Sequence, residues 1–308
     1  MKILVTGAAG YIGSVLCGYL LDAGHEVTAL DNFMYGQTSL AQYCAHPKFQ
    51  IVCGNVCDEH AQIEAMKGKD AIIPLAAIVG AAACKQNATP AVSTNHIAIR
   101  RLCEFADPTQ IILYPNTNSG YGIGKEDVCT EESELKPLSL YGVTKVDAEK
   151  CVMERNNSVS FRLATVFGAS PRMRTDLMVN EFVYRAVRDK SLVLFEPKFR
   201  RNFVHVRDVA TVFVYALQRF EVMRGKVFNV GDSRANMTKE QLCAKIAEHI
   251  DFTWIVAEFG SDPDKRDYLV SSKRIENTGW MPSRSLDDGI KELIKLYAML
   301  NDRKYGNA

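Results

Sequence analysis

The chain has 308 residues, of which 47% are hydrophobic and 24% are charged, so its composition is that of a globular protein and not of a disordered or collagen-like one. Its formal net charge is +1, which excludes the global field that would attract nucleic acid or an anionic membrane. Nine cysteines without a C-x-x-C pair fit reduced thiols better than a disulfide framework or a zinc site, so we expect a soluble, cytoplasmic protein that holds no metal.

In the first half of the chain, short β-branched runs alternate with helical stretches, which is the pattern of a parallel sheet with crossover helices. Strands are predicted, in chain order, at residues 2–6, 26–30, 49–53, 71–75, 110–114, 159–164 and 226–229. Helices are predicted at residues 12–23, 91–105, 141–155 and 206–217. The order predicts an α/β fold, a Rossmann-type doubly wound parallel sheet with a smaller mixed α/β cap.

The character of the sequence changes at residue 171, where charged residues become more frequent and the strand-like alternation fades. We expect residues 1–170, together with about 205–231, to form the domain that contains the sheet. Residues 171–204 and 232–308 are expected to form the cap. The chain is thus predicted to leave the sheet once and to return to it.

A glycine-rich turn joins the first predicted strand to the first predicted helix and reads G-x-x-G-x-x-G over residues 7–13. Glycines let a backbone turn tightly and approach a pyrophosphate, which binds at the helix N-terminus. Asp31 ends the second strand, where its carboxylate can accept hydrogen bonds from an adenine ribose and would repel a 2′-phosphate. No arginine follows in Asn32-Phe33-Met34, so the motif favours NAD over NADP; a glycine-rich turn with a surface aspartate is the alternative.

Tyr141 and Lys145 lie four residues apart in a predicted helix and therefore on one face. A tyrosine has a pKa near ~10, and a nearby ammonium group lowers that pKa toward the range of a useful base. Thr117 follows a predicted strand, at the edge where open α/β sheets bind ligands, and its hydroxyl can contact an alcohol. Taken alone, Y-x-x-x-K is typical of a solvated helix face and Thr117 of a turn cap; beside the dinucleotide motif they indicate an oxidoreductase.

Six segments together resemble the NAD-dependent nucleotide-sugar epimerases and dehydratases, an extended short-chain dehydrogenase/reductase family. The matching segments are 6–13, 30–32, 75–77, 117 with 121–122, 141–145 and 201–206, so the resemblance covers essentially the whole chain. It implies that Tyr141 is the catalytic base, that Lys145 binds the nicotinamide ribose, and that Thr117 orients the substrate hydroxyl. It also implies oxidation of a sugar C4 hydroxyl by tightly held NAD, and a homodimer formed by paired long helices.

The glycine motif and the resemblance together imply a set of cofactor-binding residues. They are Gly7, Gly10, Tyr11, Ile12, Gly13, Asp31, Asn32, Asn55, Val56, Leu75, Ala76, Ala77, Asn95, Tyr141, Lys145 and Thr165.

A nucleotide diphosphate needs arginines, whose planar guanidinium groups match phosphate oxygens. The resemblance assigns the diphosphate to Arg201, with Arg266 as a second candidate. Arg172 and Arg174 fit either a substrate contact or a surface charge. The expected substrate-binding residues are Val79, Asn118, Arg174, Asn180, Leu194, Arg201 and Arg266.

Members of this family differ in the step that comes after oxidation at C4. The 4,6-dehydratases have Thr-Asp-Glu where this chain has Thr117-Asn118-Ser119, and an amide and a hydroxyl are poor groups for eliminating water. The similar 3,5-epimerases place a cysteine at the position of Ser119. Two outcomes remain open: a 4-epimerase similar to UDP-glucose 4-epimerase, which returns the hydride to the other face, and a 4-dehydrogenase, which releases the ketone.

Four further segments, 115–124, 161–168, 170–174 and 263–271, resemble the GDP-heptose 4-dehydrogenases of capsular polysaccharide synthesis. This finer resemblance implies oxidation of GDP-D-glycero-D-manno-heptose, with the 4-epimerase as the alternative. A non-catalytic NAD-binding module is a third possibility. Such relatives lose the tyrosine or the lysine, whereas this chain keeps Tyr141 and Lys145.

Overall fold

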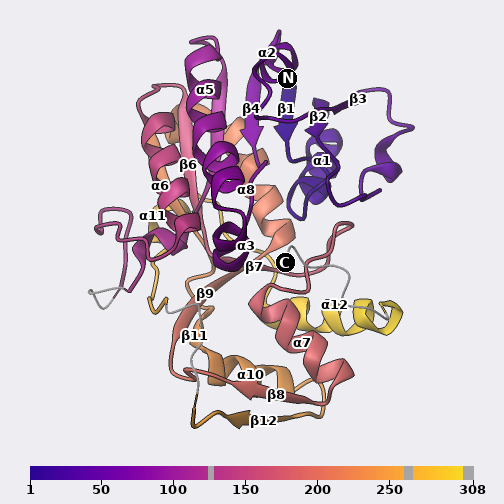
Figure 1. Cartoon of the computed structure of the whole chain (residues 1–308), viewed down its shortest axis with the longest axis vertical. Helices are drawn as coiled ribbons and strands as arrows, with labels where there is room; N and C mark the ends of the chain where they lie inside the picture. Colours follow the sequence, from indigo (N-terminus) through magenta and orange to yellow (C-terminus); the bar gives the residue numbers. More distant parts are fainter. Residues whose placement is uncertain (124–127, 260–265, 301–308) are drawn as a thin grey trace.

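A computed structural model describes residues 1–123, 128–259 and 266–300 (Figure 1). Its larger layer is a seven-stranded parallel sheet in the order β10-β6-β5-β4-β1-β2-β3. The strands are β1 (Lys2–Thr6), β2 (Glu26–Asp31), β3 (Phe49–Cys53), β4 (Ala71–Pro74), β5 (Ile111–Thr117), β6 (Ser158–Leu163) and β10 (Lys226–Val230). The order reverses between β1 and β4, so the sheet has the switch point at which doubly wound folds bind ligands. The predicted α/β fold is confirmed.

Both faces of the sheet are buried, which explains why its strands are apolar throughout. Along β1, Ile3 and Val5 face one apolar cluster, whereas Leu4 faces another. Helices α1 (Gly13–Asp22) and α8 (Val206–Gln218) pack together on the first face. The second face carries α2 (Glu59–Met66), α5 (Ala98–Phe105) and α6 (Leu140–Met153).

Two predicted elements differ from their expected form. The fifth strand, predicted at 110–114, continues to Thr117 because its pairing with β6 runs through Pro115 up to Thr117 and Leu163. The helix predicted at 91–105 is divided into α4 (Ala88–Val92), a π-helical turn η2 (Ser93–Ile97) and α5. Thr117 is therefore the last residue of a strand and not part of the loop after it.

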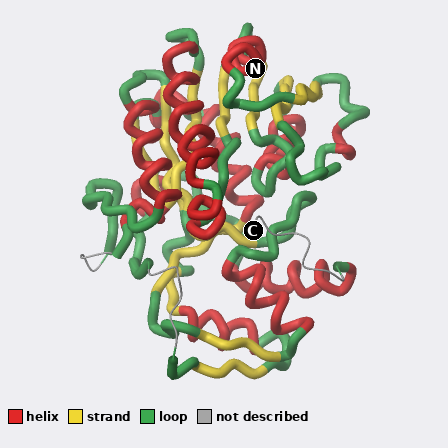
Figure 2. The backbone as a smooth tube through the Cα atoms, in the orientation of Figure 1, coloured by secondary structure: helices red, strands yellow, loops and turns green. Residues whose placement is uncertain are grey.

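The rest of the chain adds smaller, mixed sheets (Figure 2). Strands β7 (Thr165–Phe167), β9 (Arg200–His205) and β11 (Asn236–Thr238) form one sheet, and β8 (Ser191–Leu194) pairs with β12 (Thr253–Val256). Helices α7 (Met178–Arg188), α10 (Lys239–Ala247) and α12 (Leu286–Met299) lie beside these strands, below the large sheet in Figure 1. We refer to these later elements as the cap; the predicted domain boundaries remain predictions.

Short elements complete the described chain. They are the 3₁₀ turns η1 (Ala41–Tyr43) and η3 (Asn118–Tyr121), and the helices α3 (Ala81–Gln86), α9 (Phe220–Met223) and α11 (Lys273–Glu276). Across residues 1–123, 128–259 and 266–300, none of the helices combines the length and the apolar character needed to cross a bilayer.

Candidate active site

A cavity of about 1080 Å³ lies where the carboxyl ends of the large sheet meet the cap. The glycine turn and the loop after β2 form one part of its wall, and the ends of β5 and α6 form another. Most of the predicted site residues line it: Gly7, Gly10, Tyr11, Ile12, Gly13, Asp31, Asn32, Asn55, Val56, Leu75, Ala76, Ala77, Val79, Thr117, Tyr141, Lys145, Thr165, Arg174 and Arg266.

The glycine turn has no room for side chains at its two ends. Gly7 has a φ of +64°, and a Cβ added there would lie 2.6 Å from the backbone nitrogen of Ala76. A Cβ at Gly13, the first residue of α1, would lie 2.5 Å from the carbonyl oxygen of Gly7. The bare backbone therefore forms a cradle at a helix N-terminus, which is the shape that a dinucleotide pyrophosphate requires. The residues present fit NAD.

Asp31 ends β2 as predicted and borders the same cavity. Its Oδ2 accepts a hydrogen bond from the Ala9 amide (2.9 Å), and its Oδ1 accepts one from the Phe33 amide (2.8 Å). Burial raises the pKa of the Asp31 carboxyl, while these two amides act in the opposite direction. The carboxylate is thus held in a fixed orientation between the glycine turn and its own loop.

Tyr141 and Lys145 lie one turn apart on α6 and face Thr117 at the end of β5. Burial raises the pKa of Tyr141 to about 12; the guanidinium groups of Arg174 and Arg266 and a hydrogen bond with Thr117 act to lower it. Lys145 lies one turn further along α6, and its predicted effect on the pKa of Tyr141 stays a prediction.

The ammonium group of Lys145 occupies its own buried position. Its Nζ lies 4.1 Å from the centroid of the Tyr114 ring. Burial lowers the pKa of Lys145 to about 7, and the carboxylate of Glu149 raises it. Desolvation and the carboxylate of Glu149 therefore act on the charged state of Lys145 in opposite directions.

Thr117 has the turn-capping role, and its place at the cavity leaves the predicted contact with a substrate hydroxyl a prediction. Its Oγ1 donates to the Ser119 hydroxyl (2.9 Å) and accepts from the Ser119 amide, so it caps the turn η3 while lining the cavity. The guanidinium of Arg266 also donates to the Ser119 hydroxyl. Ser119 is therefore held by hydrogen bonds on two sides.

Four of the predicted substrate residues do not line the cavity. Asn118 is 1% exposed, Leu194 is buried in β8, and the buried Arg201 donates to the carbonyl oxygen of Arg266. Asn180 is buried in α7, where its Nδ2 donates to the carbonyl oxygen of Arg174 (2.8 Å). These side chains point into the protein because the strands, helix and turn that carry them are packed on that side.

Asn95, which was predicted to contact the cofactor, also lies outside the lining of the cavity. It is 1% exposed. Its side chain accepts from the Ile78 amide (2.8 Å) and donates to the Ile78 carbonyl (2.9 Å). Asn95 therefore fixes the segment after β4 and acts on the cavity wall from behind.

The sequence reasoning missed Asn116 and Glu149. The Nδ2 of Asn116 donates to Oε2 of Glu149 (2.7 Å), and Asn116 lines the cavity. Glu149 follows Lys145 by four residues, and that spacing was the one signal in the sequence that could have found it.

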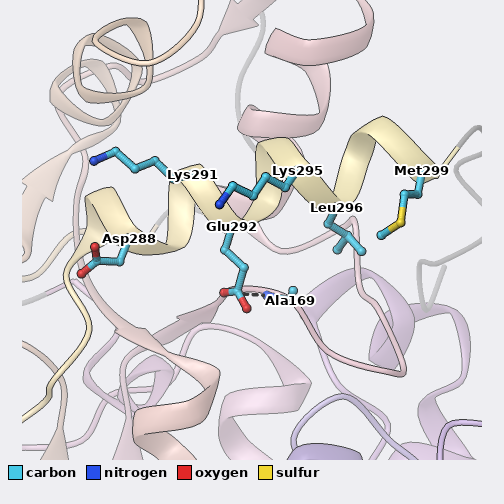
Figure 3. Close-up of a pocket in the computed structure, with 7 residues that line it drawn as sticks. All are labelled: Ala169, Asp288, Lys291, Glu292, Lys295, Leu296 and Met299. Atoms are coloured by element: carbon cyan, nitrogen blue, oxygen red, sulfur yellow. Dashed lines mark hydrogen bonds between the residues drawn. The ribbon is translucent and has the colours of Figure 1, made fainter.

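Two groups outside the cavity have clear structural roles. His205 accepts a hydrogen bond from the Arg207 amide at the start of α8, and its Nε2 lies 2.6 Å from Glu292. Burial acts to raise the pKa of Glu292, but hydrogen bonds and positive charges from His205 and Arg207 lower it to about 2. Glu292 also borders a second pocket, of about 460 Å³, where it accepts from the Ala169 amide (Figure 3). No predicted site residue lines that pocket.

One cluster of the described chain has metal-ligand spacing. Glu248, His249 and Asp287 have ligand atoms within 4.8 Å of one another. The ammonium group of Lys245 lies 2.8 Å from Glu248 and 3.0 Å from Asp287, so a cation already balances these carboxylates.

Known proteins resemble this chain over nearly its full length. Residues 3–231 match the NAD dependent epimerase/dehydratase family. An uncharacterized UDP-glucose epimerase of Bacillus subtilis is 32% identical over 257 residues, which cover 78% of this chain and 79% of that protein. A low-salt glycan biosynthesis protein of Haloferax volcanii is 27% identical over 96% of this chain and 98% of its own.

A solved structure shows the same fold. It is UDP-glucuronic acid 4-epimerase from Bacillus cereus in complex with UDP-glucuronic acid and NAD. The TM-score is 0.82 at 24% identity, with 97% of this chain and 99% of that chain covered.

Proposed function

Since this chain belongs to the NAD dependent epimerase/dehydratase family, we propose that it is a nucleotide-sugar 4-epimerase, which oxidises the C4 hydroxyl of its substrate and reduces the ketone from the other face. The family makes it an NAD-dependent enzyme that modifies nucleotide sugars; the position C4 and the epimeric product are the proposal. One observation carries it: Thr117, Tyr141 and Lys145 border the same cavity as the glycine turn and Asp31.

NAD bound at the glycine turn would supply the hydride acceptor for the oxidation and the hydride donor for the reduction, and it would add a positive charge to the site. The protein's residues handle the proton. The hydroxyl of Thr117 orients the C4 alcohol, and Tyr141 Oη takes the hydroxyl proton as the carbon–oxygen bond becomes a carbonyl. On reduction the same phenol gives the proton back to the C4 oxygen. Lys145 holds the ribose, and Arg174 and Arg266 act on Tyr141 in the direction that favours its phenolate.

The cavity supports epimerisation better than dehydration. Among the described residues, three carboxylates line it: Asp31, Asp176 and Glu181. Asp31 is held by backbone amides, Asp176 pairs with Arg174, and Glu181 pairs with Arg185. Each is already engaged, and eliminating water from a 4-keto sugar needs a donor and a base beside Thr117. The side chain two residues after Thr117 is the hydroxyl of Ser119, itself held by two hydrogen bonds.

A cofactor that stays bound supports the epimerase over the dehydrogenase. Residues 168–174 are attached to the glycine turn, because the Tyr11 hydroxyl donates to the Gly168 carbonyl (2.6 Å) and Ser170 Oγ donates to the Tyr11 carbonyl (2.7 Å). The attachment of this segment to the glycine turn favours retention of NAD between oxidation and reduction. The names of the relatives point the same way, since two of those described above are epimerases.

The finer resemblance to GDP-heptose 4-dehydrogenases is not matched by the relatives described above, none of which bears that name. Residue 124 and residues 263–265 of the resembling segments also lie outside the described residues. GDP-heptose remains one substrate to be tested, on the strength of the sequence alone.

The test is a panel of UDP- and GDP-sugars, GDP-heptose included, each carrying deuterium at C4. Deuterium retained in an inverted sugar supports the 4-epimerase. Deuterium recovered in the reduced cofactor, with rising absorbance near 340 nm, identifies a 4-dehydrogenase. A product that has lost water identifies a dehydratase. Either of the last two outcomes overturns the proposal.

A further inference from the structure

A buried network of charged and polar side chains lies behind Thr117, Tyr141 and Lys145. Its centre is Glu149, which is 5% exposed and forms an ion pair of 2.8 Å with the buried Arg162 on β6. The second carboxylate oxygen accepts from Ser160 Oγ (2.5 Å) and from Asn116 Nδ2 (2.7 Å). Both oxygens of Glu149 are thus occupied by donors from β5 and β6.

The first link to the reaction runs through Asn116. While its Nδ2 donates to Glu149, its Oδ1 accepts from the backbone amide of Thr117 (2.8 Å). The amide group of Asn116 is therefore clamped at both ends. This clamp sets the direction in which β5 ends, and with it the place of the Thr117 hydroxyl.

The second link is electrostatic. Tyr141, Lys145 and Glu149 occupy successive turns of α6, so they lie along one face of the helix. Burial disfavours the charge of Lys145, and Glu149 is the anion that supports it. Burial raises the pKa of Tyr114, whose ring lies against Lys145, and the titratable groups of Tyr141, Glu149, Cys103 and Cys151 act in the same direction.

We propose that Glu149 is a positioning residue for the reaction: through Asn116 it fixes the Thr117 hydroxyl, and through its charge it keeps Lys145 cationic. The proposal rests on the proposed function for its kinetic consequence. If Glu149 had only a structural role, its ion pair with Arg162 would be sufficient. The bond to Asn116 and the one-turn spacing from Lys145 connect this pair to two predicted catalytic residues on different elements.

Two variants of the full chain separate the two links. Glu149→Gln removes the charge, and we expect kcat to fall at least ~10-fold with KM changed less than ~3-fold, because a displaced catalytic group costs rate more than binding. We also expect the alkaline limb of both the kcat profile and the NAD-affinity profile to move to lower pH. Asn116→Ala keeps the charge of Glu149, so kcat should fall ~10-fold with no movement of either limb.

The matched control is Asp208→Asn. Asp208 is another fully buried carboxylate, bound to Ser283 and Arg284 and outside the cavity. It should lower the melting temperature while leaving kcat and the pH profiles unchanged. If Glu149→Gln does not fold, Glu149→Gln/Arg162→Gln removes both charges and serves the same comparison.

The inference is overturned if Glu149→Gln keeps the wild-type kcat and pH limbs, or if Asp208→Asn loses as much kcat as Glu149→Gln. The NAD-affinity profile, measured by calorimetry, does not require a sugar substrate. A wild-type protein that turns over no sugar therefore defeats the proposed function, while the movement of the NAD limb in Glu149→Gln still decides the role of Glu149.

Discussion

The guanidinium carbon of Arg172 lies 4.6 Å from the centroid of the Tyr35 ring, and both residues line the large cavity. Tyr35 belongs to the loop after β2, and Arg172 belongs to the loop after β7. Both loops contribute to the cavity wall, and this contact joins them. Cation–π contacts contribute about 0.5 to 2 kcal/mol, depending on how far the pair is desolvated.

Replacing Tyr35 by Ala should therefore speed the release of NAD. We expect the dissociation rate to rise about tenfold, which corresponds to about 1.4 kcal/mol. Stopped-flow displacement of NAD measures the rate directly. Tyr35→Phe keeps the ring and serves as the control. Equal release from the Ala variant and the wild type would show that the contact does not retain the cofactor.

Tyr141→Phe should abolish turnover and leave NAD bound. The substitution removes the one oxygen that takes the C4 proton, and loss of a general base costs about 100- to 10,000-fold in kcat. Phenylalanine keeps the aromatic ring that lines the cavity, so the shape of the site is preserved. Kinetics with the accepted sugar and calorimetry with NAD give the two readings. Persistent turnover would show that another group is the base.

Asp31→Ala should weaken NAD binding and reduce the preference over NADP. A hydrogen-bonded carboxylate contributes about 1.5 to 3 kcal/mol, so NAD affinity should fall about 10- to 100-fold. NADP should lose less or gain affinity, because the repulsion of its 2′-phosphate disappears. Dissociation constants for both cofactors test this, with Asp31→Asn as the milder variant, whose single amide oxygen can accept from one of the two amides of Ala9 and Phe33. An unchanged ratio of the two constants would contradict the assignment.

Lys145→Met should stabilise the fold while it removes activity. Burial lowers the pKa of Lys145 to about 7 from an ordinary value of 10.5. Between these values the folded state binds fewer protons than the unfolded state, so the contribution of this group to stability rises with pH across that window. Below about pH 7 the buried cation imposes its full cost, which Met removes.

Urea unfolding of the wild type and of Lys145→Met, from about pH 6 to about pH 10, measures that contribution. The variant should be more stable at the acidic end, and the difference should shrink as the pH rises. A variant that is less stable than the wild type at every pH would mean that Lys145 stabilises the fold through its contact with Tyr114.

The sheet could be predicted from the sequence because it is covered on both faces. Its strands are therefore short continuous apolar runs separated by helical stretches, and such runs are visible without a structure. The strands of the cap gave no such signal. Strand β8 alternates exposed and buried positions over only four residues, and its exposed Val193 is apolar, so the alternation does not show in the sequence. Strand β12 is mostly exposed although its residues are largely apolar.

For the site, motifs located residues but not the directions of their side chains. The glycine turn and the Tyr141–Lys145 pair were found because their spacing is itself the chemical requirement. Asn180 and Arg201 were selected by position in a motif, yet tertiary packing turns both side chains into the protein. Glu149 was missed because its partners, Asn116 and Arg162, are brought to it by strand pairing.

Tyr11 limits how far the cap can be exchanged for another. Its backbone belongs to the glycine turn, while its hydroxyl donates to Gly168 and accepts from Asn180 (3.2 Å), two residues outside that turn. A chimera that imports a foreign cap to change sugar preference must therefore supply an acceptor and a donor at those two positions. Without them, the glycine turn would lose two hydrogen bonds that hold it in place. A swap intended to change the sugar preference would then first reduce the affinity for NAD.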